Sequence, residues 1–138
     1  MTGKESDMAD QKSVLIVGET PEMNDFDDPA IPKGLTPEKI RAGLEKSVEE
    51  LRSKGRMARI VYLDTKETAP AQMAEALGWA KFDVIVVGAG LRIVPKQTEM
   101  FELVVNIIRT GAPQAKIAFN TSPDTSARAA ERQLATAS

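Results

Sequence analysis

The sequence contains no cysteine and no histidine. These absences exclude a disulfide framework, a thiol nucleophile and a Ser–His catalytic pair, and they remove the usual ligands of zinc sites. Histidine is also the one side chain whose ordinary pKa lies between about pH 5 and pH 8. Acid–base chemistry would therefore fall to Asp, Glu, Lys, Tyr or a bound cofactor, and we identify no metal site and no cofactor from the sequence.

The sequence also lacks a large excess of positive or negative charge, and it has no long apolar run. The 138 residues include 18 Lys and Arg and 20 Asp and Glu, a formal net charge of -2, which gives no broad basic surface for nucleic acid. The longest apolar run, residues 84–91, is far too short to span a membrane. We therefore expect a cytoplasmic protein that binds neither nucleic acid nor membranes.

The length and polarity of the sequence predict a short disordered segment followed by one domain. Residues 1–12 are polar and charged, lack the apolar segment of a secretory signal, and are expected to be disordered. A chain of this length fits one domain, which can bury an adequate core without a metal or a disulfide. Residues 13–138 are therefore predicted to form a single α/β domain.

Strand-like and helix-like segments alternate along this domain. Short runs rich in β-branched residues predict strands, whereas apolar residues at helical spacing, preceded by capping residues, predict helices. The predicted strands span residues 13–17, 59–63, 82–87 and 116–119, and the predicted helices span residues 37–54, 68–80, 95–109 and 122–134.

The alternation predicts an α/β fold with parallel strands and helices on both faces of the sheet. We expect three layers around an open parallel sheet of four or five strands. The flavodoxin-like strand order 2-1-3-4 is favoured because it puts the two most apolar strands in the middle. A central position also predicts that residues 84–87 are all buried.

The segment after the third strand is the first candidate for a binding site. In open parallel sheets, ligands bind beyond the carboxyl ends of the strands, where the strand order reverses. Gly88 and Gly90 would let backbone N–H groups approach an anion, and Arg92 would add a planar charge. Ile93 stands where a dinucleotide fingerprint needs its third glycine and no helix is expected to begin at once, which argues against a Rossmann NAD site. A tight turn with an exposed arginine is the alternative.

The segment after the fourth strand is the second candidate. Asn120, Thr121 and Ser122 precede a predicted helix, and amide and hydroxyl donors at a helix N-terminus suit an anion. Simple capping of the helix by Thr121 or Ser122 is the alternative. The two segments together predict that an anionic small molecule binds at Gly88, Gly90, Arg92, Asn120, Thr121 and Ser122.

Acidic residues near the same edge leave other interpretations open. Glu19, Asp64 or Asp124 could serve as the acid or base of an enzyme, although no spacing in the sequence pairs a nucleophile with a base. Glu19 could also form an ion pair with Arg92, which would leave no site. The long acidic loop, residues 19–33, lacks the spacing of an EF-hand and is expected to be solvated.

Two stretches of the sequence, VIVVGAGLR at residues 84–92 and KIAFNTSPDTSA at residues 116–127, resemble a group of short uncharacterised bacterial proteins. The resemblance spans most of residues 13–134. It implies an α/β, flavodoxin-like fold, and it supplies neither an activity nor a catalytic residue.

The predicted helix of residues 95–109 has an apolar face wider than a surface helix needs, covering an arc of roughly 200°. A neighbouring helix of the same chain could cover the surplus, but the last helix is rich in alanine and offers little bulk. We therefore favour a homodimer through helix 95–109, and a self-associating module without a ligand is the third functional interpretation. The apolar residues are Met100, Phe101, Leu103, Val104, Val105, Ile107 and Ile108.

Overall fold

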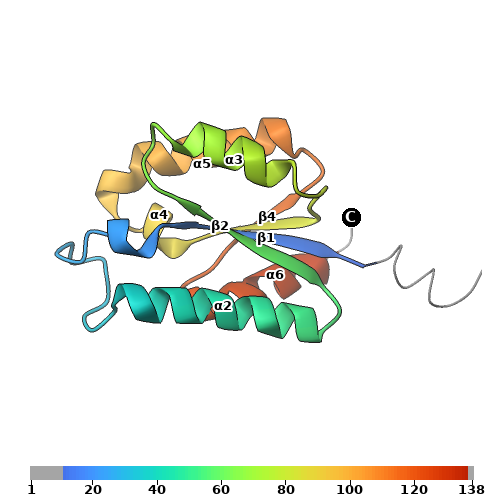
Figure 1. Ribbon diagram of the computed structural model, residues 1–138, viewed down its shortest axis with the longest axis horizontal. Coiled ribbons are helices and arrows are strands. Elements are labelled where there is room, and N and C mark those ends of the chain that lie inside the picture. The colour runs from blue at the N-terminus through green and yellow to red at the C-terminus, as the bar shows by residue number, and fades with distance from the viewer. Residues whose placement is uncertain (1–10, 137–138) are drawn as a thin grey trace, which may run out of the picture.

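The computed structural model describes residues 11–136, in which a four-stranded sheet is covered by helices on both faces (Figure 1). All neighbouring strands are parallel, and their order is β2-β1-β3-β4. This open sheet confirms the flavodoxin-like order predicted from the sequence. The strands are β1 (Ser13–Glu19), β2 (Met57–Leu63), β3 (Val84–Val87) and β4 (Lys116–Phe119).

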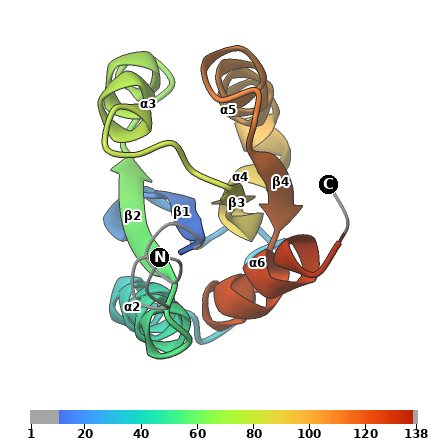
Figure 2. The same ribbon diagram turned by 90° about the vertical axis from the view of Figure 1, so that its right-hand side faces the viewer.

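Two pairs of helices make the outer layers. Figure 2 shows α3 and α5 on one face of the sheet and α2 and α6 on the other, and each pair covers its own apolar cluster. Within residues 11–136, no helix has the length and apolar character that crossing a membrane requires. The bounds are α2 (Pro37–Ser53), α3 (Ala69–Leu77), α5 (Thr98–Gly111) and α6 (Ser126–Leu134).

The two central strands form the middle of the core. Every residue of β1 and of β3 is buried, because both strands have a neighbour on each side and helices above and below. The predicted burial of residues 84–87 is therefore confirmed. Since side chains alternate along a strand, Ile85 and Val87 pack under α3 and α5, whereas Val84 and Val86 pack under α2 and α6.

Local sequence signals set both ends of α2, the helix that borders the site described below. The side chain of Thr36 accepts a hydrogen bond from the Lys39 N–H at 3.2 Å, and Pro37 occupies the first helical position. At the other end Gly55 has φ 81°, a left-handed conformation that glycine adopts without strain. The predicted helix 37–54 and α2 therefore nearly coincide.

Two helix starts differ from the prediction because a tight turn comes before each helix. The segment expected to begin a helix at residue 95 forms a 3-10 turn, η2 (Pro95–Gln97), before α5 begins. The segment expected to begin one at residue 122 forms another, η3 (Pro123–Thr125), before α6 begins. Such tight turns are frequent at helix N-termini, where the first N–H groups have no partner inside the helix.

The predicted disordered segment, residues 1–12, lies outside the described residues except for its last two. Gln11 Nε2 donates to the carbonyl oxygen of Gly55 at 3.0 Å. The carbonyl oxygen of Lys12 accepts from the Met57 N–H at 2.9 Å. These two residues thus continue the contact between β1 and β2 beyond the end of the sheet.

Candidate ligand-binding site

The carboxyl ends of β1, β3 and β4 meet at one edge of the sheet, where a cavity of about 490 Å³ opens beside α2. This edge is at the left-hand end of the sheet in Figure 1. A volume of this size is typical of small-molecule sites, which usually measure about 300–1,000 Å³. The position is the one predicted from the sheet topology.

Aliphatic side chains make up much of the cavity wall. Ile40 and Leu44 come from α2, Ile31 and Leu35 come from the loop before α2, and Ile93 follows α4 (Ala89–Arg92). Ile31 is only 6% exposed, so the long loop that we expected to be solvated supplies part of an apolar wall. The cavity is therefore suited to an organic molecule with an apolar body.

Gly88 and Gly90, which we predicted to bind an anion, line the cavity, but two of the three N–H groups of residues 88–90 already have hydrogen-bond partners. The Gly88 N–H donates to the carbonyl oxygen of Val17 at 2.8 Å, and the Ala89 N–H donates to Asn120 Oδ1 at 2.7 Å. Among the described residues, the Gly90 N–H has no hydrogen-bond partner and remains for a ligand. A Cβ at Gly88 would lie 3.2 Å from the Val17 carbonyl oxygen, so a larger residue would require the strand ends to move apart by a few tenths of an ångström.

The expectation that no helix begins directly after β3 was wrong. The short helix α4 begins at Ala89, and the Gly88 carbonyl oxygen accepts from the Leu91 N–H at 3.1 Å. The Ala89 carbonyl oxygen then accepts from the Ile93 N–H at 2.8 Å. The side chain of Asn120 holds the first amide of this turn, and nothing in the local sequence of residues 88–92 predicts that contact.

Arg92 lies outside the cavity. Its guanidinium donates to the carbonyl oxygen of Asn120 at 2.9 Å and lies over the ring of Phe119, 5.6 Å from the ring centre. It forms no ion pair with Glu19, so the predicted Glu19–Arg92 alternative is not realised. The arginine instead helps to hold the end of β4.

Asn120, Thr121 and Ser122, which we predicted to bind an anion, line the cavity. Asn120 is 2% exposed, and its amide both accepts from the Ala89 N–H and donates to Ser126 Oγ at 2.9 Å. Both ends of that side chain are therefore engaged inside the protein. Ser122 caps the turn that leads into α6, and its hydroxyl donates to Asp124 Oδ1 at 2.7 Å.

Glu19, the last residue of β1, is the only buried ionisable side chain within residues 11–136, with 9% of its surface exposed. It lines the cavity, and its Oε2 accepts a hydrogen bond from Gln97 Nε2. Burial raises the pKa of Glu19 to about 7, against a lowering by the Gln97 hydrogen bond and with a further rise from the charge of Asp25. Near neutral pH the cavity thus contains a carboxyl group that titrates.

The three candidate acids do not come together. Asp64 accepts hydrogen bonds from the Thr20 hydroxyl and, at 2.9 Å, from Gln72 Nε2, and it does not line the cavity. Asp124 is exposed at the cavity rim. In the part of the chain that the structure describes, no group of three or more acidic side chains is arranged to hold a metal ion.

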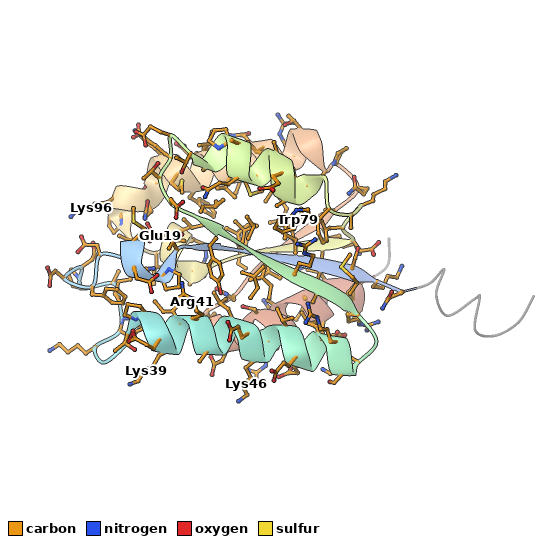
Figure 3. All side chains as sticks on the ribbon, viewed as in Figure 1. Glu19, Lys39, Arg41, Lys46, Trp79 and Lys96 are labelled. Carbon is orange, nitrogen blue, oxygen red and sulfur yellow. The ribbon has the colours of Figure 1, made fainter. Side chains whose placement is uncertain are left out.

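Two lysines that the sequence analysis did not single out border the cavity. Lys39 and Lys46 are exposed residues of α2 and project from its side away from the sheet (Figure 3). The Nζ of Lys39 donates to the carbonyl oxygen of Gly34 at 2.9 Å. Positive charge therefore lies at the solvent side of the cavity, whereas the Glu19 carboxyl lies at its buried side.

The same loop that supplies the apolar wall is tied down by ion pairs. Lys96 Nζ lies 2.7 Å from Asp25 Oδ2, and Arg41 donates to both oxygens of Glu22 at 2.9 and 3.1 Å. These contacts attach the loop to η2 and to α2. The length of the loop was the sequence signal that could have pointed to this role, since long loops in compact domains are often binding loops.

Comparisons with known proteins give no significant match to this chain among protein-family models, curated proteins or solved structures. The function therefore has to be argued from the cavity, its walls and the groups that face it.

Proposed function

We propose that this protein is a small-molecule-binding domain whose ligand occupies the cavity at the carboxyl edge of the sheet. One observation carries the proposal: strand ends, the N-terminal half of α2 and the loop before it converge on a cavity of about 490 Å³ with aliphatic walls. Polar groups are few and placed at particular points of the wall, which is the usual composition of a site for an organic ligand.

An enzymatic function is less well supported by the same geometry. Only one of the three candidate acids, Glu19, is buried beside the cavity, and its side-chain neighbour is Gln97 rather than a nucleophile. Catalysis by an acid–base or nucleophilic route needs a second reactive group within hydrogen-bond reach. A binding or regulatory role requires no such group.

The anionic ligand predicted from the sequence has a reduced set of donors. The Gly90 amide and the Thr121 hydroxyl border the cavity, while the Ser122 hydroxyl donates to Asp124 and Arg92 is turned to Asn120 and Phe119. The Glu19 carboxylate would repel an anion held near it. The binding experiment therefore includes anionic compounds as one of several ligand classes.

Occupation of the cavity is expected to raise the melting temperature of the protein, because a ligand that binds only the folded state stabilises it. The test is a thermal-shift screen of carboxylated, phosphorylated and amine-bearing ring compounds. Ala42→Trp, at an exposed cavity-lining position of α2, is expected to abolish the shift by filling the opening.

Glu45→Trp is the matched control, since Glu45 is exposed on the same helix but does not line the cavity. It should keep the full shift. A screen without any shift in the wild type, or equal shifts in both tryptophan variants, would count against a ligand in this cavity.

We also propose that the protein forms a homodimer through α5 and the neighbouring edge strand β4. The sheet-facing residues of α5 are buried, and α3 packs along one flank of the helix (Figure 2). Among residues 11–136, the short elements α4 and η2 also contact α5, and no long helix covers its other flank. Phe101 of this flank lies 5.8 Å, ring centre to ring centre, from Phe119, which is 38% exposed. Val105 is half-buried on the same flank. An apolar strip beside an unpaired strand edge is a typical association surface.

Light scattering is expected to give the mass of a dimer for the wild type at tens of micromolar. Val105→Asp should shift the protein to monomer, because a charge in an apolar interface is costly to desolvate. Asn106→Asp adds the same charge at the next, exposed position and should leave the dimer intact. A monomeric wild type at this concentration would contradict the dimer.

A further inference from the structure

The Glu19 carboxyl borders the cavity and forms no ion pair with any cation of residues 11–136. Gln97 donates to its Oε2, and within residues 11–136 no other donor reaches the carboxyl. The ion pairs of that part of the chain all involve other acids. A buried carboxylate in this position is therefore incompletely compensated.

Three cations on the segments around Glu19 have partners other than its carboxyl. Lys39 and Lys46, which line the cavity, project from α2 away from the sheet. Lys96 is paired with Asp25 at 2.7 Å, and Arg41 is paired with Glu22 at 2.9 Å. Arg92 donates to the Asn120 carbonyl oxygen. Figure 3 shows Glu19 at the end of the sheet, with Lys96 on one side and Arg41 toward α2. None of these cations forms an ion pair with Glu19.

Asn24 brings a second acceptor to the wall of the same cavity. Its Nδ2 donates to the carbonyl oxygen of Pro21 at 3.1 Å and to that of Thr20 at 3.5 Å, and these bonds set the orientation of the amide. Its Oδ1 then faces Gly90, because a Cβ built at Gly90 would lie 3.0 Å from that oxygen. Asn24 and Gly90 both line the cavity.

A carboxylate oxygen and an amide oxygen beside one apolar cavity call for hydrogen-bond donors on the ligand. A buried carboxylate is tolerated when a positive, hydrogen-bonding group compensates it. We propose that the ligand carries a protonated nitrogen, an ammonium or amidinium group, that binds the Glu19 carboxylate while its apolar body contacts Ile40 and Leu44. This proposal rests on the small-molecule function proposed above and specifies the chemistry of its ligand.

The experiment compares three ring compounds that differ in one group: benzylamine, benzyl alcohol and benzoate. Their affinities are measured from the amide resonances of Gly18, Gly88 and Gly90 in nitrogen–proton NMR spectra, since these residues line the cavity. Benzylamine is expected to bind most tightly. Glu19→Gln should weaken benzylamine binding by about tenfold or more, because hydrogen bonds to a charged group contribute more than neutral ones.

The pH dependence gives a second, independent readout. The Glu19 carboxyl has a pKa of about 7, to which the charge of Asp25 contributes, and Asp25 itself is paired with Lys96. With this pKa, the Glu19 carboxyl is mostly protonated at pH 6 and mostly ionised at pH 8. Benzylamine affinity of the wild type should therefore rise severalfold from pH 6 to pH 8, and that of Glu19→Gln should stay flat. Glu45→Gln, which removes an exposed carboxylate outside the cavity, should behave as the wild type.

Three results would overturn the inference, and each has a different consequence for the proposed small-molecule function. Equal binding of benzylamine and benzyl alcohol, unchanged in Glu19→Gln, would retain the cavity as a site and remove the nitrogen specificity. Tightest binding of benzoate would establish the anionic ligand predicted from the sequence. Absence of binding by all three compounds would remove both this inference and the proposed small-molecule function.

Discussion

The Val86→Asp variant is expected to lose its cooperative unfolding transition. Val86 is 0% exposed on a central strand, between β1 and β4 and under α2 and α6. An aspartate there would bury a carboxylate without a partner, which costs several kcal/mol against a total stability of about 5–15 kcal/mol. Circular dichroism during urea unfolding measures the effect.

Val86→Ala separates charge burial from loss of packing. It removes two methyl groups from the same place and is expected to cost about 2 kcal/mol while keeping a cooperative transition. A soluble Val86→Asp protein that unfolds cooperatively, near the midpoint of the alanine variant, would contradict the central position of β3.

The Glu19→Gln variant is expected to be more stable than the wild type at pH 8, by about 2–3 kcal/mol. The folded state raises the pKa of Glu19 from 4.5 to about 7, chiefly because burial disfavours the charged form. The folded protein therefore binds this proton more tightly than the unfolded chain does. Its favourable contribution is complete below about pH 4.5 and is lost as the pH rises through 7.

The measurement is the free energy of unfolding of both proteins from pH 4 to pH 9. The difference between them should be small and constant at the acidic end, increase between about pH 4.5 and pH 7, and level off above pH 7. Both proteins contain the carboxyls whose pKa values are lowered by ion pairs, such as Glu22 and Glu131. Their contribution to the pH dependence therefore cancels in the difference between the two free energies of unfolding. The Glu45→Gln control should parallel the wild type, and a parallel course for Glu19→Gln would show that Glu19 is ionised without cost.

Part of the candidate site was predictable because it follows from topology. Gly88 and Gly90 follow β3, and Asn120, Thr121 and Ser122 follow β4, and parallel strands bring their carboxyl ends to one edge. The predicted adjacency of these two segments is confirmed by the hydrogen bond between Asn120 and the Ala89 N–H.

The chemistry of the site was less predictable because it depends on contacts between segments that are distant in the chain. Arg92 is well placed in the sequence to meet an anion, yet it donates to a carbonyl oxygen 28 residues away. Glu19 accepts a hydrogen bond from Gln97, 78 residues away, and no motif around Gln97 marks it as a site residue in the sequence. Side-chain partners of this kind have no local signature.

Hydrophobic periodicity and capping residues determined the α/β class, the strand order and the positions of the main helices. These properties depend on neighbouring residues and on the burial that a parallel sheet imposes, so they can be read along the chain. Only the tertiary structure decided that the acidic loop supplies apolar wall residues, that Arg92 is turned away and that Glu19 is buried beside the cavity. The reason is that burial and hydrogen bonding of a polar group are settled by whatever the fold brings next to it, and residues far apart in the sequence provide those neighbours.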